Sequence, residues 1–230
     1  MIPIKDNVPT RSFPLVTVLL IAANFAVWIF YELPHLQHST AQFAFQPCEV
    51  DHSCPDSTAT GNGPLVTSFT SMFMHASWLH ILGNMLFLWI FGNNVEDALG
   101  HVRFLLWYLA AGLAAAGLQT FVTLHYAGAT AASVPNIGAS GAIAGVLGAY
   151  FILLPRARVL TWIVIIIREI PAFWFLGIWF LYQAYLGDLS LTHPGQSGGV
   201  ALFAHVGGFL FGVLTVKLVQ VRQPLRPSYT

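Results

Sequence analysis

Long, almost uninterrupted apolar runs are the feature of this 230-residue sequence that most constrains its fold. A helix needs about 20 mostly apolar residues to cross a bilayer, because each residue rises about 1.5 Å through a core about 30 Å thick. Six runs meet this requirement to within a few residues: Phe13–Tyr31, Met72–Gly92, Phe104–Leu124, Ile137–Leu154, Ile170–Leu186 and Gly199–Val219. The sequence therefore predicts an all-α, polytopic membrane protein with six transmembrane helices.

Composition excludes three other classes of protein. Charged residues make up only 8% of the chain, whereas a soluble domain has about 25%. The net charge is zero, so we expect no nucleic-acid partner. The 18 Phe, 7 Trp and 7 Tyr exclude a disordered chain. The expected surroundings are a lipid bilayer.

The distribution of Lys and Arg predicts the orientation of the six spans. With the amino terminus inside, all basic residues fall in cytoplasmic tails or in the loops after the second and fourth spans: Lys5, Arg11, Arg103, Arg156, Arg158, Arg168, Lys217, Arg222 and Arg226. The opposite loops contain acidic residues and neither Lys nor Arg. We therefore expect both termini to be cytoplasmic.

The chain is expected to form one membrane domain over residues 1–230. It has cytoplasmic tails at 1–12 and 220–230 and an outer loop at 32–71. The first apolar run is longer than the core of a signal peptide, so we interpret it as an uncleaved helix. The run Val159–Ile167 is too short to cross a bilayer and is expected to be interfacial or re-entrant.

Both cysteines, Cys48 and Cys54, lie in the predicted outer loop. Oxidation is permitted on that side, so a local disulfide is plausible, with free thiols as the alternative. A zinc site with Asp51 and His52 is a competing hypothesis, but the spacing matches no standard ligand pattern. We predict no metal ion and no cofactor.

Four of the polar residues within the apolar runs are candidates for function, because ionisable groups are costly there and often functional. They are Ser140, His205, His80 and Asn84, on the fourth, sixth and second spans. Each alone has a structural explanation, such as helix packing or a hydrogen bond between helices. However, all four are expected at similar depth, roughly 5–18 Å below the outer face. Similar depth on three helices indicates one site.

Small residues allow the fourth and sixth spans to approach each other closely. Gly141 and Gly145 share a face with Ser140, and Gly208 and Gly212 have the spacing typical of helix pairs in contact. Such packing would bring the Ser140 hydroxyl to the His205 imidazole, which suits a nucleophile and its general base. His80, Asn84 and backbone N–H groups near Ser140 are candidate oxyanion donors. Spans four to six offer no carboxylate at this depth, so we expect a Ser–His dyad.

These residues resemble the rhomboid family of intramembrane serine proteases. The matching stretches are Met74 to Asn84 (MHASWLHILGN), Gly138 to Gly145 (GASGAIAG) and Gly198 to Gly208 (GGVALFAHVGG). The resemblance implies that Ser140 is the nucleophile and His205 the base, with an oxyanion site at His80, Asn84 and the Ser140 backbone that Gly138 shapes.

The resemblance also implies partners and a location. Expected substrates are the transmembrane segments of single-pass membrane proteins, cut near the outer face of a bacterial cytoplasmic membrane. Glu96 resembles an acidic family position that braces the fold, while a surface carboxylate is the alternative. Two family features are absent: a Trp-Arg pair in the first outer loop, and an aromatic residue at position 144, where the sequence has Ala144.

Two other functions compete with proteolysis. An inactive relative that binds membrane clients is disfavoured, because such proteins usually lose the serine or the histidine. A proton-coupled transporter using His80 and His205 is disfavoured because no repeat-related pair of discontinuous helices is visible.

Overall fold

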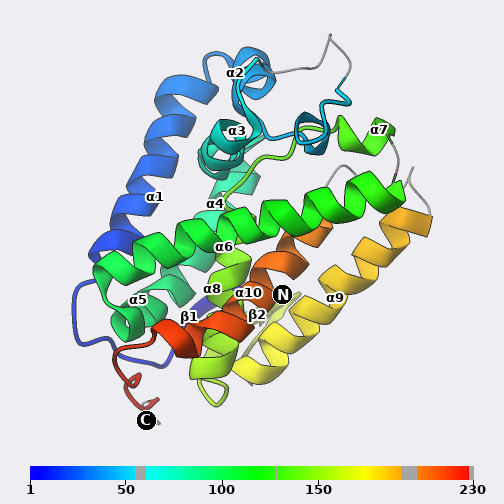
Figure 1. The fold of residues 1–230 in the computed structure, drawn as a ribbon. Coiled ribbons are helices and arrows are strands. Elements are labelled where there is room, and N and C mark those ends of the chain that lie inside the picture. The colour runs from blue at the N-terminus through cyan, green and yellow to red at the C-terminus, as the bar shows by residue number, and fades with distance from the viewer. Residues whose placement is uncertain (55–60, 128, 193–200, 228–230) are drawn as a thin grey trace.

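A computed structural model describes residues 1–54, 61–127, 129–192 and 201–227, with the side chains of 190–192 left undescribed. The chain is mostly helical (Figure 1). The α-helices are α1 (Leu15–Val27), α2 (Leu36–Phe43), α3 (Pro64–Thr70), α4 (Trp78–Phe87), α5 (Asn93–Leu99), α6 (His101–Val122), α7 (Ala129–Ala132), α8 (Ser140–Leu153), α9 (Ala172–Thr192) and α10 (Leu202–Val219). Short π- or 3₁₀-helical turns are η1 (Trp28–Glu32), η2 (Pro47–Glu49), η3 (Ser71–Phe73), η4 (Leu88–Gly92) and η5 (Thr123–Ala127).

Within the described residues, three continuous helical segments are long and apolar enough to cross a membrane. They are Leu15–Glu32, His101–Ala127 and Leu202–Val219. A fourth is the bent pair Pro64–Phe73 and Trp78–Leu99. Helix α8 has only 14 residues, fewer than a spanning helix needs. The helical membrane fold was therefore predicted from the sequence, and length and apolarity identify three of the six predicted spans, or four with the bent pair.

The second predicted span is not one straight helix. The chain bends by 85° between Phe73 and Trp78, and the helix after the bend continues to Leu99 instead of ending at Gly92. Ser77 starts this second helix by accepting a hydrogen bond from the backbone N–H of His80 at 3.2 Å. Gly100 ends it with a φ of +76°, a conformation that glycine adopts without strain.

A small antiparallel sheet corrects the all-α prediction. Strand β1 (Ile2–Asp6) pairs with β2 (Arg158–Ile163), which pairs with β3 (Ile166–Pro171). The sheet includes most of the run that was expected to be interfacial or re-entrant, and part of the amino-terminal tail. The reason is local, because the run is rich in β-branched Val, Ile and Thr, which favour strands.

The predicted outer loop at 32–71 has secondary structure of its own, containing α2, η2 and α3. Cys48 and Cys54 form a disulfide within it. The alternative zinc site is wrong in this structure, because both sulfur atoms are bonded to each other. No group of three or more His, Cys, Asp or Glu side chains in the described ranges could hold a metal ion.

Helices α6, α8 and α10 pack together in the middle of the molecule, with α1 on one side and α9 on the other (Figure 1). The backbones of α8 and α10 touch at glycines. A Cβ on Gly208 would lie 2.0 Å from the Gly141 carbonyl oxygen, and one on Gly212 would lie 2.0 Å from that of Gly145. Only glycine fits at positions 208 and 212, so these residues allow the backbone contact between the two helices.

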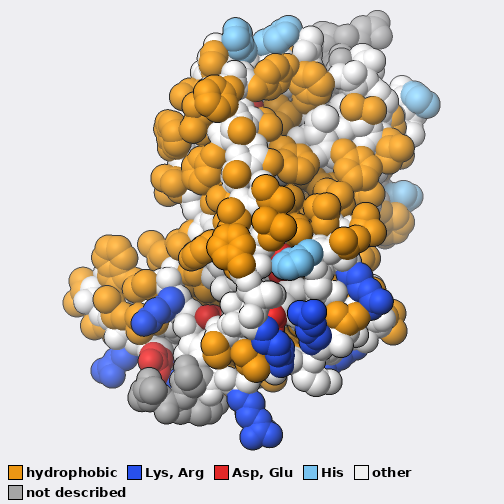
Figure 2. Space-filling model, turned by 90° about the vertical axis from the view of Figure 1, so that its left-hand side faces the viewer, with side chains coloured by type: hydrophobic (Ala, Val, Ile, Leu, Met, Phe, Trp, Pro, Cys, Tyr) orange, Lys and Arg blue, Asp and Glu red, His pale blue; other side chains and the backbone are white. Residues whose placement is uncertain are grey.

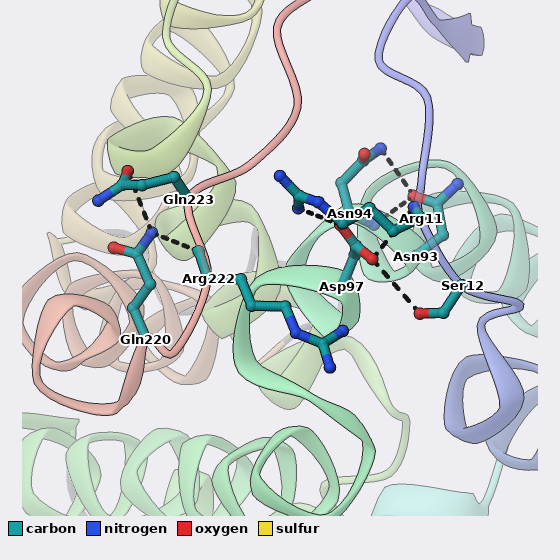
Figure 3. A network of polar contacts seen from close by, with 8 residues as sticks. All are labelled: Arg11, Ser12, Asn93, Asn94, Asp97, Gln220, Arg222 and Gln223. Carbon is teal, nitrogen blue, oxygen red and sulfur yellow. Dashed lines mark hydrogen bonds and ion pairs between the residues drawn. The ribbon is translucent and has the colours of Figure 1, made fainter.

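Polar contacts tie both ends of the chain to α5. The Asp97 carboxylate accepts hydrogen bonds from Arg11 and Ser12 of the amino-terminal segment (Figure 3). The backbone N–H of Arg222, in the carboxy-terminal segment, donates to the carbonyl of Ala98 at 3.0 Å. Lys and Arg side chains gather at one end of the face shown in Figure 2, while hydrophobic side chains cover much of the remainder.

Glu96 is buried and is not the surface carboxylate that the sequence left as an alternative. Its carboxylate accepts from the backbone N–H groups of Val16 and Thr17 at 2.9 and 2.8 Å, and from the Thr17 hydroxyl at 2.7 Å. Glu96 therefore caps the start of α1, a helix end whose N–H groups have no partner within the helix.

Candidate active site

Ser140 and His205 lie in hydrogen-bond contact. The Ser140 Oγ is 2.8 Å from the Nε2 of His205. Ser140 is the first residue of α8 and His205 the fourth residue of α10, so both belong to the first turn of their helices. Both side chains are half-buried. A hydroxyl bonded to an imidazole is the pair that nucleophilic catalysis needs.

The segment before Ser140 shapes the approach to its hydroxyl. The predicted span began at Ile137, whereas the helix begins at Ser140, so this residue lies at the helix end and not one turn inside. Gly138 has a φ of +124°, and its N–H donates to the Ser71 carbonyl at 2.8 Å. The first N–H groups of a helix have no partner within it and carry partial positive charge. The Ser140 backbone is thus suited to bind an oxyanion.

His80 and Asn84 face the same segment from α4. A Cβ on Gly138 would lie 2.8 Å from the His80 Nε2 and 3.6 Å from the Asn84 Nδ2. The Nδ1 of His80 accepts from the backbone N–H of Ala76 at 3.3 Å. A neutral imidazole has one N–H, so the proton of His80 lies on Nε2, beside Gly138. His80 therefore presents a donor to the region next to Ser140.

Two buried residues, His75 and Glu32, support the side chain of Asn84. The Asn84 Nδ2 is 3.0 Å from the Nε2 of His75, and the backbone N–H of His75 is 2.9 Å from each carboxylate oxygen of Glu32. Glu32 and His75 are both fully buried. Neither role was predicted from the sequence: Glu32 was placed in the outer loop, and His75 was given no role of its own. The available signal for His75 was its place in the stretch Met74 to Asn84, five residues before the predicted oxyanion donor His80.

Residues of α9 contact the His205 ring, including the nitrogen that does not face Ser140. The Nδ1 of His205 is 2.7 Å from the Oε1 of Gln183, which is only 9% exposed. The Trp179 ring, one turn earlier on α9, lies 5.9 Å from the imidazole centroid. Neither contact with His205 was predicted from the sequence. The available signal was a single Gln in a run that is otherwise almost entirely apolar or aromatic.

A cavity of about 510 Å³ opens beside Ser140 and His205. A liquid water occupies about 30 Å³, so the cavity has room for several water molecules and a peptide segment. Its lining includes Ala76, Ser77, His80, Asn84, Pro135, Asn136, Ile137, Ser140, Ala201 and His205. The four polar residues that the sequence singled out thus share one cavity with space for water.

The family model for the Rhomboid domain matches residues 62–222, which include every residue that lines this cavity. The chain belongs to the rhomboid family. This family includes intramembrane proteases, and its members act on membrane proteins within the bilayer.

Curated rhomboid relatives are about 30% identical to this chain over the residues that align. The mitochondrial presenilin-associated rhomboid-like protein of Bos taurus is 31% identical over 197 residues, which are 84% of this chain and 46% of the relative. The mitochondrial Rhomboid protein 1 of Saccharomyces cerevisiae is 31% identical over 149 residues, 63% of this chain and 39% of the relative. YdcA of Bacillus subtilis is 31% identical over 146 residues, 63% of this chain and 64% of the relative. This rhomboid spans less than half the length of the mitochondrial relatives it matches.

The alanine at position 144, where some rhomboids have an aromatic residue, has a physical reason here. A Cβ on Gly208 would lie 3.2 Å from the Cβ of Ala144, and Ala144 is fully buried. An aromatic ring on α8 at this level would push α10 away. In this rhomboid the ring beside His205 comes from α9 instead, as Trp179.

Proposed function

We propose that this protein is an intramembrane serine endopeptidase that cleaves single-pass membrane proteins through a Ser140–His205 dyad. The observation that carries the proposal is the 2.8 Å contact between the Ser140 Oγ and the His205 Nε2. Membership of a family that includes intramembrane proteases supports it.

The reaction starts with attack of the Ser140 Oγ on the scissile carbonyl carbon while its proton moves to the His205 Nε2. The oxyanion accepts hydrogen bonds from the His80 Nε2–H, the Asn84 amide and the Ser140 backbone N–H. His205 then gives its proton to the leaving amine as the C–N bond breaks, which leaves an acyl ester on Ser140. A water molecule, deprotonated by His205, hydrolyses this ester and restores the Ser140 hydroxyl.

The short helix α8 suits chemistry below a membrane surface. Its 14 residues give a length of about 21 Å, less than the hydrocarbon core of about 30 Å. If the basic end of α8 lies at one surface, Ser140 is buried several ångströms below the other. The cavity then supplies the water that hydrolysis needs.

The topology belongs to the same proposal. Six spans, cytoplasmic termini and a site that opens on the extracytoplasmic side of a cell membrane agree with the Lys and Arg distribution. Labelling of single cysteines with an impermeant reagent from each side of sealed vesicles tests this orientation.

The decisive experiment compares cleavage of a tagged transmembrane substrate by the wild type, Ser140→Ala and His205→Ala in detergent and in vesicles. We expect cleavage by the wild type and its loss in both variants. Equal cleavage by all three proteins would exclude the proposed dyad. The alternative of an inactive client-binding protein predicts no cleavage and no reaction of folded wild type with a serine-directed fluorophosphonate.

A further inference from the structure

The imidazole of His205 is held at both of its nitrogens. The Nε2 contacts the Ser140 Oγ at 2.8 Å, and the Nδ1 contacts the Gln183 Oε1 at 2.7 Å. These contacts come from α9 and α8, the two helices that lie on either side of α10 in Figure 1. Gln183 is buried and Trp179 lies beside the ring. The ring therefore has a fixed orientation.

The Gln183 contact also selects the tautomer of the neutral imidazole. An amide oxygen only accepts hydrogen bonds, so the His205 Nδ1 must carry the proton in this contact. The Nε2 then has a free lone pair directed at Ser140, and the serine hydroxyl donates to it. In the opposite tautomer the Nε2–H would donate to Ser140, and the ring could not accept the serine proton.

We infer that Gln183 is a positioning residue that keeps His205 in the tautomer able to deprotonate Ser140. The inference rests on the proposed function. A neutral amide provides the acceptor without a permanent charge, which would be costly between membrane helices. The amide oxygen also accepts from the Nδ1–H while the ring is protonated during the reaction. The Gln183 contact therefore persists in both the neutral and the protonated form of His205.

Three variants test this role. Gln183→Leu removes the acceptor, Gln183→Glu keeps one, and Tyr182→Leu changes an exposed neighbour on the same helix as a matched control. The measurements are kcat and KM for the transmembrane substrate and the second-order rate of fluorophosphonate labelling at Ser140. Gel filtration and thermal unfolding show whether each variant is folded, and Gln183→Met replaces Gln183→Leu if the latter is not.

Loss of the acceptor should lower kcat and the labelling rate by about 10- to 100-fold, by analogy with the loss of a partner that orients a metal-binding histidine. KM should stay near the wild-type value, and Gln183→Glu should recover most of the activity. Tyr182→Leu should match the wild type.

Two results would overturn the inference while leaving the protease intact. One is that cleavage by the wild type requires Ser140 but the Gln183→Leu variant is as active as the wild type. The other is an equal loss in folded Gln183→Leu and Gln183→Glu, which would show that the acceptor is not what matters. A wild type that neither cleaves nor labels would instead refute the proposed function.

A second, independent observation concerns the tip of the hairpin between β2 and β3. Its two turn residues, Val164 and Ile165, are 84% and 87% exposed. Val164 has a φ of +56°, where two-residue hairpin turns favour Asn or Gly and a β-branched residue is strained. In water, exposed apolar side chains would not stabilise the turn, so they would not offset the strain of the positive φ at Val164.

Side chains near the tip have the order expected at a membrane surface. Trp162 pairs with Ile167 across the strands just behind the turn, and both are exposed. Arg168 lies further from the tip on β3 and is exposed as well. Trp prefers the headgroup level of a bilayer, while Arg reaches the phosphates.

We propose that this hairpin tip inserts into the headgroup layer of a leaflet that contains anionic lipid. The hairpin joins the end of α8 to the start of α9, so in the proposed topology it lies where these two apolar helices reach the membrane surface. The turn's backbone still needs hydrogen bonds, which hydrocarbon cannot supply, so the insertion stays shallow.

An environment-sensitive dye on Val164→Cys tests this contact, because Cys48 and Cys54, the two native cysteines, are bonded to each other. Gln223→Cys is the control, exposed in the carboxy-terminal segment. In vesicles of phosphatidylcholine with phosphatidylglycerol, we expect spin-labelled lipid to quench the Val164 dye and iodide to quench only the control. Arg168→Gln should weaken the dependence on phosphatidylglycerol.

Equal quenching of both dyes by iodide would refute the lipid contact. Protection from both quenchers, with self-quenching that grows with protein density, would assign the tip to a second copy of the chain and would also refute it.

Discussion

The Ser140 Oγ and the His205 Nε2 are 2.8 Å apart although 65 positions separate the two residues in the chain. The contact depends on how closely α8 and α10 approach each other. At Gly208 and Gly212 a side chain would collide with the carbonyl oxygens of Gly141 and Gly145. The nucleophile and its base therefore meet only because the two helix backbones touch below them.

Substitution of Gly208 by Ala should separate the two helices. The added Cβ would lie 2.0 Å from the Gly141 carbonyl oxygen, a backbone atom that can move only with its helix. Overpacking of this kind costs about 1–3 kcal/mol, so we expect that loss in the free energy of unfolding. Fluorophosphonate labelling of Ser140 should fall as well, because the His205 contact lengthens.

Gly117→Ala is the matched control for this substitution. Gly117 lies on α6, and a Cβ there would have nothing within 4 Å. Ala favours a helix by about 1 kcal/mol over Gly, so this variant should be as stable as the wild type or slightly more stable. Equal stability of Gly208→Ala and Gly117→Ala would contradict the close-packing argument.

Asn84→Ala should slow the chemical step with little effect on substrate binding. The Asn84 amide lies near Gly138 and lines the same cavity as Ser140, where the oxyanion would form. Removal of one oxyanion donor typically lowers kcat about 100- to 1,000-fold. We expect a fall in this range with KM nearly constant, measured on the transmembrane substrate. A change in KM alone would assign Asn84 to substrate binding instead.

The cluster around Ser140 could be predicted because its signals are local. His80 and Asn84 share a helix face through their spacing, and polar residues are conspicuous in apolar runs. The glycines on the fourth and sixth runs indicated which helices approach each other. These patterns depend only on helix geometry, which the sequence expresses directly.

The supporting contacts could not be predicted in the same way. Gln183 reaches His205 only because α9 packs against α10, and Glu32 reaches His75 only because the second span bends by 85°. Both depend on tertiary packing that periodicity does not specify. The sheet was missed for another reason: Val159–Ile167 was judged by its length as a span, although its β-branched residues favoured a strand.

Glu96→Gln should destabilise the fold without altering the proposed active site. The Glu96 carboxylate accepts bonds from two backbone N–H groups and one hydroxyl at the start of α1. An amide offers only one accepting atom, so a buried donor loses its partner at a cost of about 1–3 kcal/mol. Denaturation in detergent followed by circular dichroism measures this loss.

Glu169→Gln is the control for Glu96→Gln. Glu169 pairs with Arg158 at 3.3 Å, and both side chains are about half exposed. Exposed ion pairs contribute about 0–1 kcal/mol, so this variant should remain close to the wild type. If the two variants lose equal stability, the capping role of Glu96 is wrong.

Asp6, on β1 and outside the predicted spans, should make stability depend on pH. Burial raises its pKa from 3.8 to about 6, although the hydrogen bond from Tyr150 opposes the shift. The folded chain therefore holds this proton more tightly than the unfolded chain does. Stability from this group is fully present below about pH 4 and is lost as pH rises through about 6.

Denaturation midpoints between pH 4 and 7 should thus decline in the wild type, and less so in Asp6→Asn, which stays neutral. Asp51→Asn, at a fully exposed position, should keep the wild-type decline. Parallel curves for the wild type and Asp6→Asn would show that Asp6 is not the group responsible.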